Sequence, residues 1–430
     1  MNEGLIILIA FLICICIHVR WKINLGVLAT ACALIIGCYL FGLAPGRIYS
    51  YIPVKILMSL VPITMFYGFA MENGTLAILV NKALSLTGKH TWLIPIGIFT
   101  LCYLLGIAGL SCAAIVAIVA PLAIPLAEAA GCNLLLCAAA IAYGPVGGSN
   151  FPTSAGGVAA RSIVESTSDF GDESIAIAMN WFFDNSLVCI LIFAAAYVLL
   201  KGYRTTGKVL KIDPTEKMNR TQKINAILIL AITLVVVFPT ILHYAANGSA
   251  VHTFFSRIDL ALAMSIGIIL CCILKLGSFQ SVITHHIPWN TIITVCGCSM
   301  LIGLGTEVGI IDRLSQAIST NVPAVVIAPV LAIVAGIMSC FSSTIGVVVP
   351  TLYPMVPGIA AATGISAAHM YSAIFMGASA TGFSPFSVGG ALVQSTVKDM
   401  EKREALTVPM IILVVIALLT TAVFYLVDLT

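Results

Sequence analysis

Residues Gly144–Gly157 read GPVGGSNFPTSAGG, and the related sequence GASATGFSPFSVGG occupies Gly377–Gly390. Five glycine, proline or serine residues of the first copy recur 233 positions later: Gly144, Pro152, Ser154, Gly156 and Gly157. Glycine and proline interrupt a helix. Inside a membrane, the backbone groups that such a break frees are tolerated only where they are buried in protein or line a cavity. Two matched interruptions in apolar sequence therefore indicate a secondary transporter whose binding site lies at the breaks.

The composition places the chain in a membrane. It has 430 residues, of which 60% are hydrophobic and 9% charged, whereas a soluble domain has about 25% charged residues. Apolar runs of about 17–25 residues recur along the chain and are long enough to cross a bilayer. We therefore predict an all-α polytopic membrane protein. The net charge of +3 is spread over loops, so no nucleic-acid partner is expected.

Ten spans are predicted from the apolar runs, five in each half of the chain. They cover residues 4–19, 23–43, 52–72, 133–165, 174–200, 224–243, 258–275, 288–304, 366–397 and 405–427. The fourth and the ninth are expected to be broken helices, interrupted at 147–157 and 380–390.

Two further apolar segments, residues 92–130 and 322–362, are interrupted by glycine, proline and serine. Each fits either two spans or one re-entrant hairpin. If both are hairpins and the N-terminus is outside, 15 of the 20 basic residues lie on the cytoplasmic side, in agreement with the positive-inside rule. The first hairpin then opens from the cytoplasm and the second from outside. Both termini are expected outside, and the membrane is expected to be the inner (plasma) membrane.

An odd number of spans in each half makes the second half inverted relative to the first. We predict two inverted repeats, residues 1–200 and 224–430, joined by a basic cytoplasmic linker at 201–223. Two amphipathic segments, Gly74–Lys89 and Thr306–Thr320, precede the hairpins and are expected to lie along the membrane surface.

The hairpin tips and helix breaks carry the candidate binding residues. A helix N-terminus presents unpaired N–H groups and a partial positive charge, which suits a carboxylate. Freed carbonyl and hydroxyl oxygens suit Na⁺. The expected substrate-binding residues are Ser111, Cys112, Asn150, Pro152, Thr153, Ser342, Ser343, Thr344, Ser384 and Pro385. The expected cation-binding residues are Gly109, Ser111, Gly148, Ser149, Ser154, Ser342, Thr344, Ser379, Thr381 and Ser387.

Two charged residues offer further possibilities. Asp184 lies inside the fifth predicted span, where an ionisable group is a functional candidate. It fits equally a proton or cation site and a hydrogen-bonded structural role. Arg161, just after the first break, is a second candidate for contacting a substrate carboxylate. The sequence shows no nucleophile, nucleotide or metal motif, so we expect no enzyme and no cofactor apart from Na⁺ as the coupling ion.

Two stretches carry a family resemblance. Asn24–Leu84, with Glu72-Asn-Gly-Thr-Leu76 near its end, and Gly382–Gly390 are similar to malonate/dicarboxylate carriers of the MatC type. The pattern of hairpins, broken helices and inverted halves resembles the ion transporter superfamily, in particular the divalent anion:sodium symporters. That resemblance implies an elevator-type homodimer with Ser-Asn-Thr at each hairpin tip. Here the tips read Ser111-Cys-Ala113 and Ser342-Ser-Thr344.

The combined expectation is Na⁺-coupled symport of small di- or tricarboxylates. Two alternatives stay open: H⁺-coupled symport or exchange with Asp184 carrying the proton, and the membrane subunit of a tripartite carrier that needs a separate binding protein.

Overall fold

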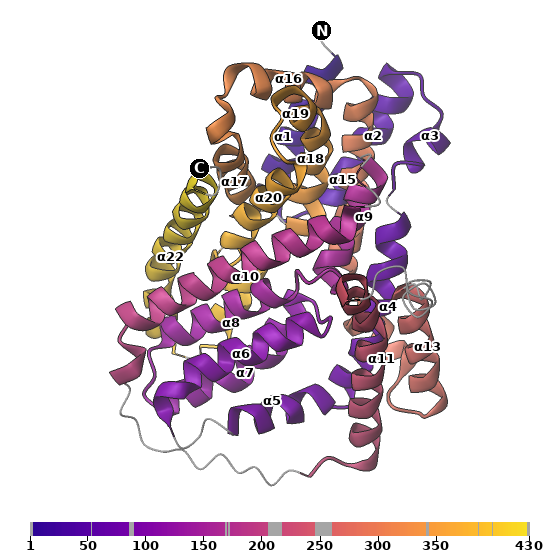
Figure 1. Ribbon diagram of the computed structural model, residues 1–430. Helices are drawn as coiled ribbons and strands as arrows, with labels where there is room; N and C mark the ends of the chain where they lie inside the picture. Colours follow the sequence, from indigo (N-terminus) through magenta and orange to yellow (C-terminus); the bar gives the residue numbers. More distant parts are fainter. Residues whose placement is uncertain are drawn as a thin grey trace.

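The computed structural model describes residues 3–52, 54–85, 90–167, 170, 173–204, 217–245, 260–340, 344–385, 387–397 and 399–427. Every regular element within these ranges is a helix (Figure 1). In the described part of the chain, four helical stretches are both long and apolar enough to cross a membrane: Cys112–Ala129, Ser174–Leu199, Thr344–Thr363 and Met400–Val427. Several shorter apolar helices accompany them. The chain is thus an all-helical polytopic membrane protein, while the count of ten spans and their inversion stay predictions.

The first half contains ten α-helices in the described residues. They are α1 (Glu3–Trp21), α2 (Leu25–Ile35, extended by a π-helical turn at Ile36–Leu40), α3 (Pro45–Tyr49), α4 (Val54–Glu72), α5 (Thr75–Ser85), α6 (Ile94–Ile107), α7 (Cys112–Ala129), α8 (Leu134–Gly148), α9 (Ala155–Thr167) and α10 (Ser174–Leu199). Short 3₁₀ turns, η2 (Thr91–Leu93) and η4 (Gly202–Arg204), precede α6 and follow α10.

The second half repeats much of this order. Its helices are α11 (Arg220–Ala245), α13 (Leu260–Ile273), α14 (Phe279–His285), α15 (Trp289–Glu307), α16 (Ile310–Asn321), α17 (Ala324–Cys340), the π-helical η5 (Thr344–Val348), α18 (Val349–Leu352), η6 (Tyr353–Met355), α19 (Val356–Thr363), α20 (Ala367–Ala380), α21 (Val388–Ser395) and α22 (Met400–Val427).

The predicted helix ranges need one correction. Their outer bounds agree with the observed helices within five residues. The breaks are shorter than predicted, because among the described residues only 149–154, 381–385 and 387 leave the helix. Gly156 and Gly157 lie inside α9. A Cβ on Gly157 would lie 2.0 Å from the Phe151 carbonyl oxygen. This glycine therefore allows close backbone packing and does not end a helix.

Glycines in left-handed conformation make matching turns in the two halves. Gly131 (φ 69°) follows α7, and Gly364 (φ 73°) follows α19 at the position 233 residues later. Gly74 (φ 75°) precedes α5, and Gly309 (φ 72°) precedes α16. A side chain is disfavoured at such a φ, which explains why glycine occurs there. Helix α5, which covers most of the first predicted amphipathic segment, is bent by 71° relative to α4.

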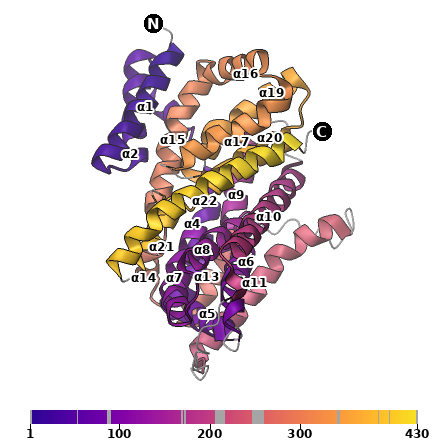
Figure 2. The ribbon, with the colours of Figure 1, turned by 90° about the vertical axis from the view of Figure 1, so that its left-hand side faces the viewer.

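Helices of the two predicted hairpin segments pack against the broken helices in the centre of the molecule. Helix α6 packs along α8, and its counterpart α17 packs along α20. Helix α10 contacts both α8 and α20, and so joins the two halves. Helix α22 crosses one side of the molecule past α17 and α20 (Figure 2). Outside this centre, α2 packs on α15 and α4 on α13.

Candidate functional site

The first break is organised by the side chain of Ser154. Its hydroxyl lies 2.7 Å from the carbonyl oxygen of Phe151, is also hydrogen-bonded to that of Ser149, and accepts the N–H of Gly157 at 3.4 Å. Ser154 therefore closes the turn and caps the N-terminus of α9, as serine commonly does.

The second break has the same hydrogen-bond pattern. The Ser387 hydroxyl lies 2.8 Å from the Gly382 carbonyl oxygen and 2.7 Å from that of Ser384. It accepts the N–H of Gly390 at 3.2 Å. Each of these residues stands 233 positions after its counterpart in the first break. The repeated sequence therefore folds into a repeated local structure.

Helix α10 supplies hydrogen-bond donors to the first break. Asn185 Nδ2 donates to the Val146 carbonyl oxygen at 2.8 Å, and Asn150 Nδ2 donates to the same oxygen at 2.6 Å. Trp181 Nε1 donates to the Asn150 carbonyl oxygen at 3.2 Å. These contacts satisfy carbonyls that the broken helix leaves without their usual partners. Trp181 is not among the site residues predicted from the sequence. The one feature of the sequence that could have marked it is its polar indole N–H within an apolar helix.

The first hairpin tip lies against the first break. A Cβ on Gly106 would come within 2.5 Å of the backbone nitrogen of Ser149. Ser111 is half-buried and caps α7, because its hydroxyl accepts the N–H of Ala114 at 3.3 Å. Gly109, at φ 113°, gives the tip its turn beside the ring of Tyr67. Cys112 is the first, half-buried residue of α7, where helix N–H groups lack helical partners.

The second hairpin tip is described only in part. Ser342 and Ser343 lie outside the described residues. Thr344 begins the returning arm, and its hydroxyl lies 3.0 Å from that of Ser339. It also donates to the Ala378 carbonyl oxygen at 3.5 Å. The start of this arm is thus next to the last turn of α20, just before the second break.

The two breaks approach each other across the middle of the protein. The Tyr143 hydroxyl of α8 donates to the Ala380 carbonyl oxygen at 3.2 Å, and its ring centroid lies 5.8 Å from that of Phe383. A Cβ on Gly382 would touch the side chain of Val146. The described candidates that lie in the breaks, at the hairpin tips or in the adjoining helix turns are Gly109, Ser111, Cys112, Gly148, Ser149, Asn150, Pro152, Thr153, Ser154, Thr344, Ser379, Thr381, Ser384, Pro385 and Ser387. All of them are uncharged, so the polarity of the centre comes from oxygens, amides and helix ends.

Asp184 belongs to a different cluster. Ser372 donates to its Oδ2 at 2.5 Å, and Tyr425 donates to the same oxygen at 3.3 Å. The two hydroxyl oxygens are 2.6 Å apart. The cluster joins α10, α20 and α22. Asp184 thus contacts α20 and α22, whereas its neighbour Asn185 contacts the first break. Ser372 and Tyr425 were missed, because no local motif marks either residue.

Arg161 is already paired. Its Nε lies 3.0 Å from Oε1 of Glu165, one helical turn later. A substrate carboxylate would have to compete with this partner.

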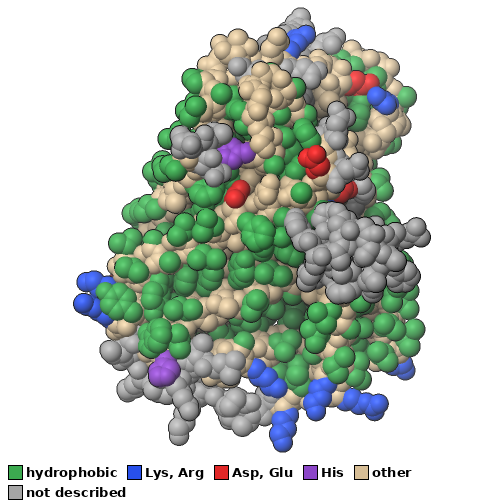
Figure 3. Space-filling view, in the orientation of Figure 1, with side chains coloured by type: hydrophobic (Ala, Val, Ile, Leu, Met, Phe, Trp, Pro, Cys, Tyr) green, Lys and Arg blue, Asp and Glu red, His purple; other side chains and the backbone are tan. Residues whose placement is uncertain are grey.

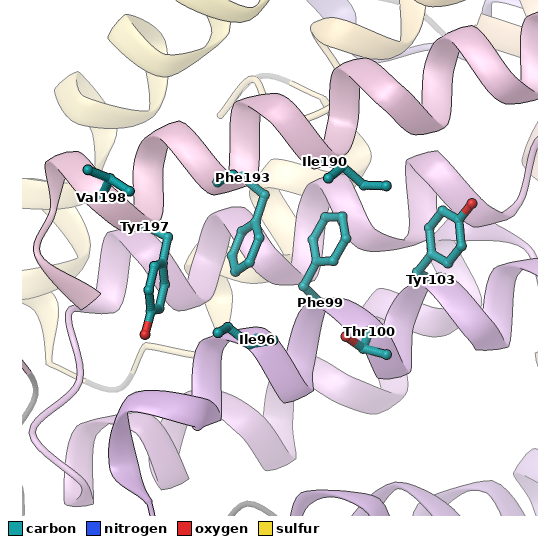
Figure 4. Close-up of a pocket in the computed structure, with 9 residues that line it drawn as sticks. Ile96, Phe99, Thr100, Tyr103, Ile190, Phe193, Tyr197 and Val198 are labelled. Atoms are coloured by element: carbon teal, nitrogen blue, oxygen red, sulfur yellow. The ribbon is translucent and has the colours of Figure 1, made fainter. Parts of the chain in front are cut away.

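A cavity of about 450 Å³ lies between α6 and α10, and no residue of the two helix breaks lines it (Figure 4). Its walls are almost entirely apolar, which does not suit a dicarboxylate.

Comparison with known proteins agrees with this architecture. Residues 1–149 match the family profile described as the dicarboxylate carrier protein MatC N-terminus. The resemblance to carriers of the MatC type is confirmed over residues 1–149. The matched region is about a third of the chain and ends at the first helix break. A search of curated protein sequences finds no match.

The fold is similar to that of a solved transporter. The crystal structure of the Alcanivorax borkumensis YdaH transporter, reported to have an unusual topology, aligns with a TM-score of 0.56. The alignment covers 90% of this chain and 87% of that chain at 13% sequence identity. An identity this low shows the fold alone. Both matches are to transporters, and together they support a membrane-embedded transporter.

Proposed function

We propose that the protein is a secondary active transporter that couples Na⁺ to the symport of small di- or tricarboxylates. The observation that carries this proposal is the pairing of two helix breaks. They share one hydrogen-bond pattern, meet across the centre of the molecule and have the described parts of the hairpin tips beside them. Matched broken helices near the middle of a membrane protein are typical of a transporter binding site.

The helix ends at this centre favour an anionic substrate. Helix α7 begins at the first hairpin tip, α9 begins at the first break, and α21 begins at the second break. Such ends attract carboxylate through free N–H groups and a partial positive charge. The family profile over residues 1–149 names a dicarboxylate carrier, which supports a substrate with two carboxylates.

The oxygens at the breaks favour Na⁺ as the coupling ion. The backbone of residues 148–150 and of residues 379–381 carries carbonyls at helix C-termini, the negative end of the helix dipole. Unwound carbonyls and helix C-terminal ends coordinate Na⁺ in transporters with broken helices. Neighbouring hydroxyls, among them those of Thr344 and Thr381, add further oxygen ligands.

We further propose an elevator motion between two inverted halves. The moving part would contain the hairpins, the broken helices, α10 and α22. The scaffold would contain α1, α2, α4, α11, α13 and α15, and would form the contact of a homodimer. The matched pairs α2–α15 and α4–α13 support such a scaffold. Basic side chains gather along the lower edge of Figure 3. We take this edge as the cytoplasmic side, which supports the proposed orientation with both termini on the outer side of the plasma membrane.

The coupling is tested with purified protein in proteoliposomes. Uptake of labelled malonate, succinate and citrate would be measured with an inward Na⁺ gradient and with choline in its place. The proposal expects saturable uptake of at least one of these anions that requires Na⁺. Equal uptake with Na⁺ and with choline would refute Na⁺ coupling. No uptake by the purified chain would instead favour a carrier that needs a separate binding protein.

A matched pair of serines tests the location of the site. Ser111 caps α7 and Ser278 caps α14, and each accepts an N–H at 3.3 Å. Replacing either by alanine should therefore cost a similar stability, about 1 kcal/mol. Only Ser111→Ala should raise the KM for substrate, because only Ser111 is at the hairpin tip. An equal effect of Ser278→Ala on KM would argue against a site at this tip.

The Asp184 cluster gives H⁺ coupling a structural basis as the second candidate. A carboxylate that accepts from Ser372 and Tyr425 could exchange a proton as α10, α20 and α22 shift. Under this alternative, Asp184→Asn abolishes uptake driven by a pH gradient. Under Na⁺ coupling, the same variant keeps Na⁺-dependent uptake.

A further inference from the structure

The cavity between α6 and α10 is an apolar groove with a row of aromatic rings. The ring centroids of Phe99 and Phe193 are 4.5 Å apart, and Tyr103 and Tyr197 extend the row by 6.2 Å on either side. Figure 4 shows these rings one after another between the two helices. The groove has a volume of about 450 Å³ and is open to the outside of the protein. Hydrophobic side chains cover much of the face along which α10 runs (Figure 3).

Aromatic and basic side chains gather at one end of this groove. The Tyr197 hydroxyl donates to the Trp92 carbonyl oxygen at 3.0 Å, which joins the end of α10 to η2. Turn η4 contacts η2 and packs on Tyr197, because Gly202 leaves no room for a Cβ against that ring. Two exposed basic residues, Lys201 and Arg204, flank this glycine, and the Arg204 guanidinium lies 5.7 Å from the centroid of the Tyr203 ring.

The combination of these features matches a phospholipid. Tryptophan and tyrosine are enriched at the membrane–water interface, where one end of the side chain is apolar and the other is hydrated. Here Trp92 is 41% exposed and Tyr203 is 50% exposed. Basic residues next to such a belt attract anionic headgroups, and arginine binds phosphate through paired hydrogen bonds. The lining residues of the groove itself carry no charge.

We propose that this groove binds an anionic glycerophospholipid. One acyl chain lies along the rings of Phe99, Phe193 and Tyr103, and the phosphate lies at Lys201 and Arg204. The charge of the two basic residues selects an anionic headgroup over a zwitterionic one. This proposal needs only the membrane location of the chain and is independent of the substrate and of the coupling ion.

The site also connects to the helix break. Tyr103 lines the groove, and its hydroxyl donates to Ser186 at 2.9 Å. Ser186 in turn lies 3.4 Å from the Gly147 carbonyl oxygen. A bound acyl chain would therefore pack α6 and α10 together next to the first break.

The test measures lipid binding directly. Purified protein would be delipidated in a neutral detergent, and phosphatidylglycerol or phosphatidylcholine with the same acyl chains would be added. Bound lipid would be counted by native mass spectrometry, and the melting temperature would be recorded for each lipid. The proposal expects phosphatidylglycerol to bind more tightly than phosphatidylcholine and to raise the melting temperature more. Equal binding of the two lipids would overturn it.

Matched variants locate the lipid. Lys201→Gln should weaken phosphatidylglycerol binding by about fivefold, the effect of one charge near a membrane surface. Lys275→Gln should leave it unchanged, although Lys275 is also exposed and has the same φ of 52° at a helix end. Ala194 lines the groove, whereas the neighbouring exposed Ala195 does not. Ala194→Trp should therefore remove the bound lipid and Ala195→Trp should retain it. Retained lipid in Ala194→Trp, or a changed oligomeric state with unchanged lipid, would overturn the proposal.

Discussion

An alanine at Gly377 would disrupt the contact between α17 and α20. Its Cβ would lie 2.0 Å from the Ala332 carbonyl oxygen, whereas ordinary contacts begin at about 3.4 Å. The two helices would therefore have to separate by about 1.4 Å there. The obstacle is backbone, so no side-chain rotation can relieve it. Overpacking of this kind typically costs about 1–3 kcal/mol, and we expect Gly377→Ala to reach the upper part of that range.

Alanine substitutions at two other glycines provide a comparison for the destabilisation expected at Gly377. At Gly144, the equivalent position of the first half, a Cβ would lie 2.7 Å from the Phe99 carbonyl oxygen. The required separation is about 0.7 Å, so Gly144→Ala should cost less. At Gly46, in α3, a Cβ meets nothing within 4 Å and φ is not positive. Gly46→Ala should leave the protein as stable or more stable, by up to about 1 kcal/mol, because alanine favours a helix.

The assay is unfolding of the detergent-solubilised protein by urea, with uptake measured in parallel. Stability should fall in the order Gly46→Ala, Gly144→Ala, Gly377→Ala. Uptake should fall further in Gly377→Ala than stability explains, since moving α20 also moves Ala378 away from Thr344. If Gly377→Ala unfolds at the same urea concentration as the unchanged protein, α17 and α20 do not pack as closely as described.

Four other substitutions have expected outcomes in the same titration. Ser154→Ala should lower the free energy of unfolding by about 1–3 kcal/mol, because it removes the side-chain donor to the Ser149 carbonyl and the acceptor for the N–H of Gly157. Ser387→Ala should cost less, since that hydroxyl is half-buried and water can replace it; the reverse order would contradict this reasoning. Trp181→Phe should cost about 1–3 kcal/mol by removing the indole N–H from a buried carbonyl of the first break, while the ring can still stack on Phe375. Faster hydrogen exchange around that break would confirm it. Tyr67→Phe should cost about 0.5–1.5 kcal/mol, the usual contribution of one hydrogen bond, because its hydroxyl bonds the first hairpin tip. Unchanged stability would exclude that bond.

Much of the candidate site was accessible from local sequence. The repeat 233 residues apart located both breaks, because Gly, Pro and Ser act on the backbone of their own segment. Ser154 and Ser387 were predicted to be cation ligands, which stays a prediction, and the structure shows that both residues cap helices. The lengths of the breaks were overestimated, because Gly156 and Gly157 were read as helix breakers, whereas they lie in α9 and allow close packing.

Other features depend on contacts between distant segments. Trp181 and Tyr143 donate to the breaks only because α10 and α8 pack there. Asp184 was noticed as an ionisable residue inside a predicted span, but its partners Ser372 and Tyr425 are 188 and 241 residues away. No spacing rule connects residues so far apart in sequence.

The sequence by itself therefore determined the membrane environment, the helix positions and the two broken segments. These follow from hydropathy and from the backbone preferences of glycine and proline, which act within a few residues. Only the tertiary structure decided which carbonyls of the breaks are satisfied, how the two breaks meet, and that an aromatic groove lies between α6 and α10. Those features require the packing of helices from both halves, because a buried polar group takes whichever partner the packing places within hydrogen-bonding distance.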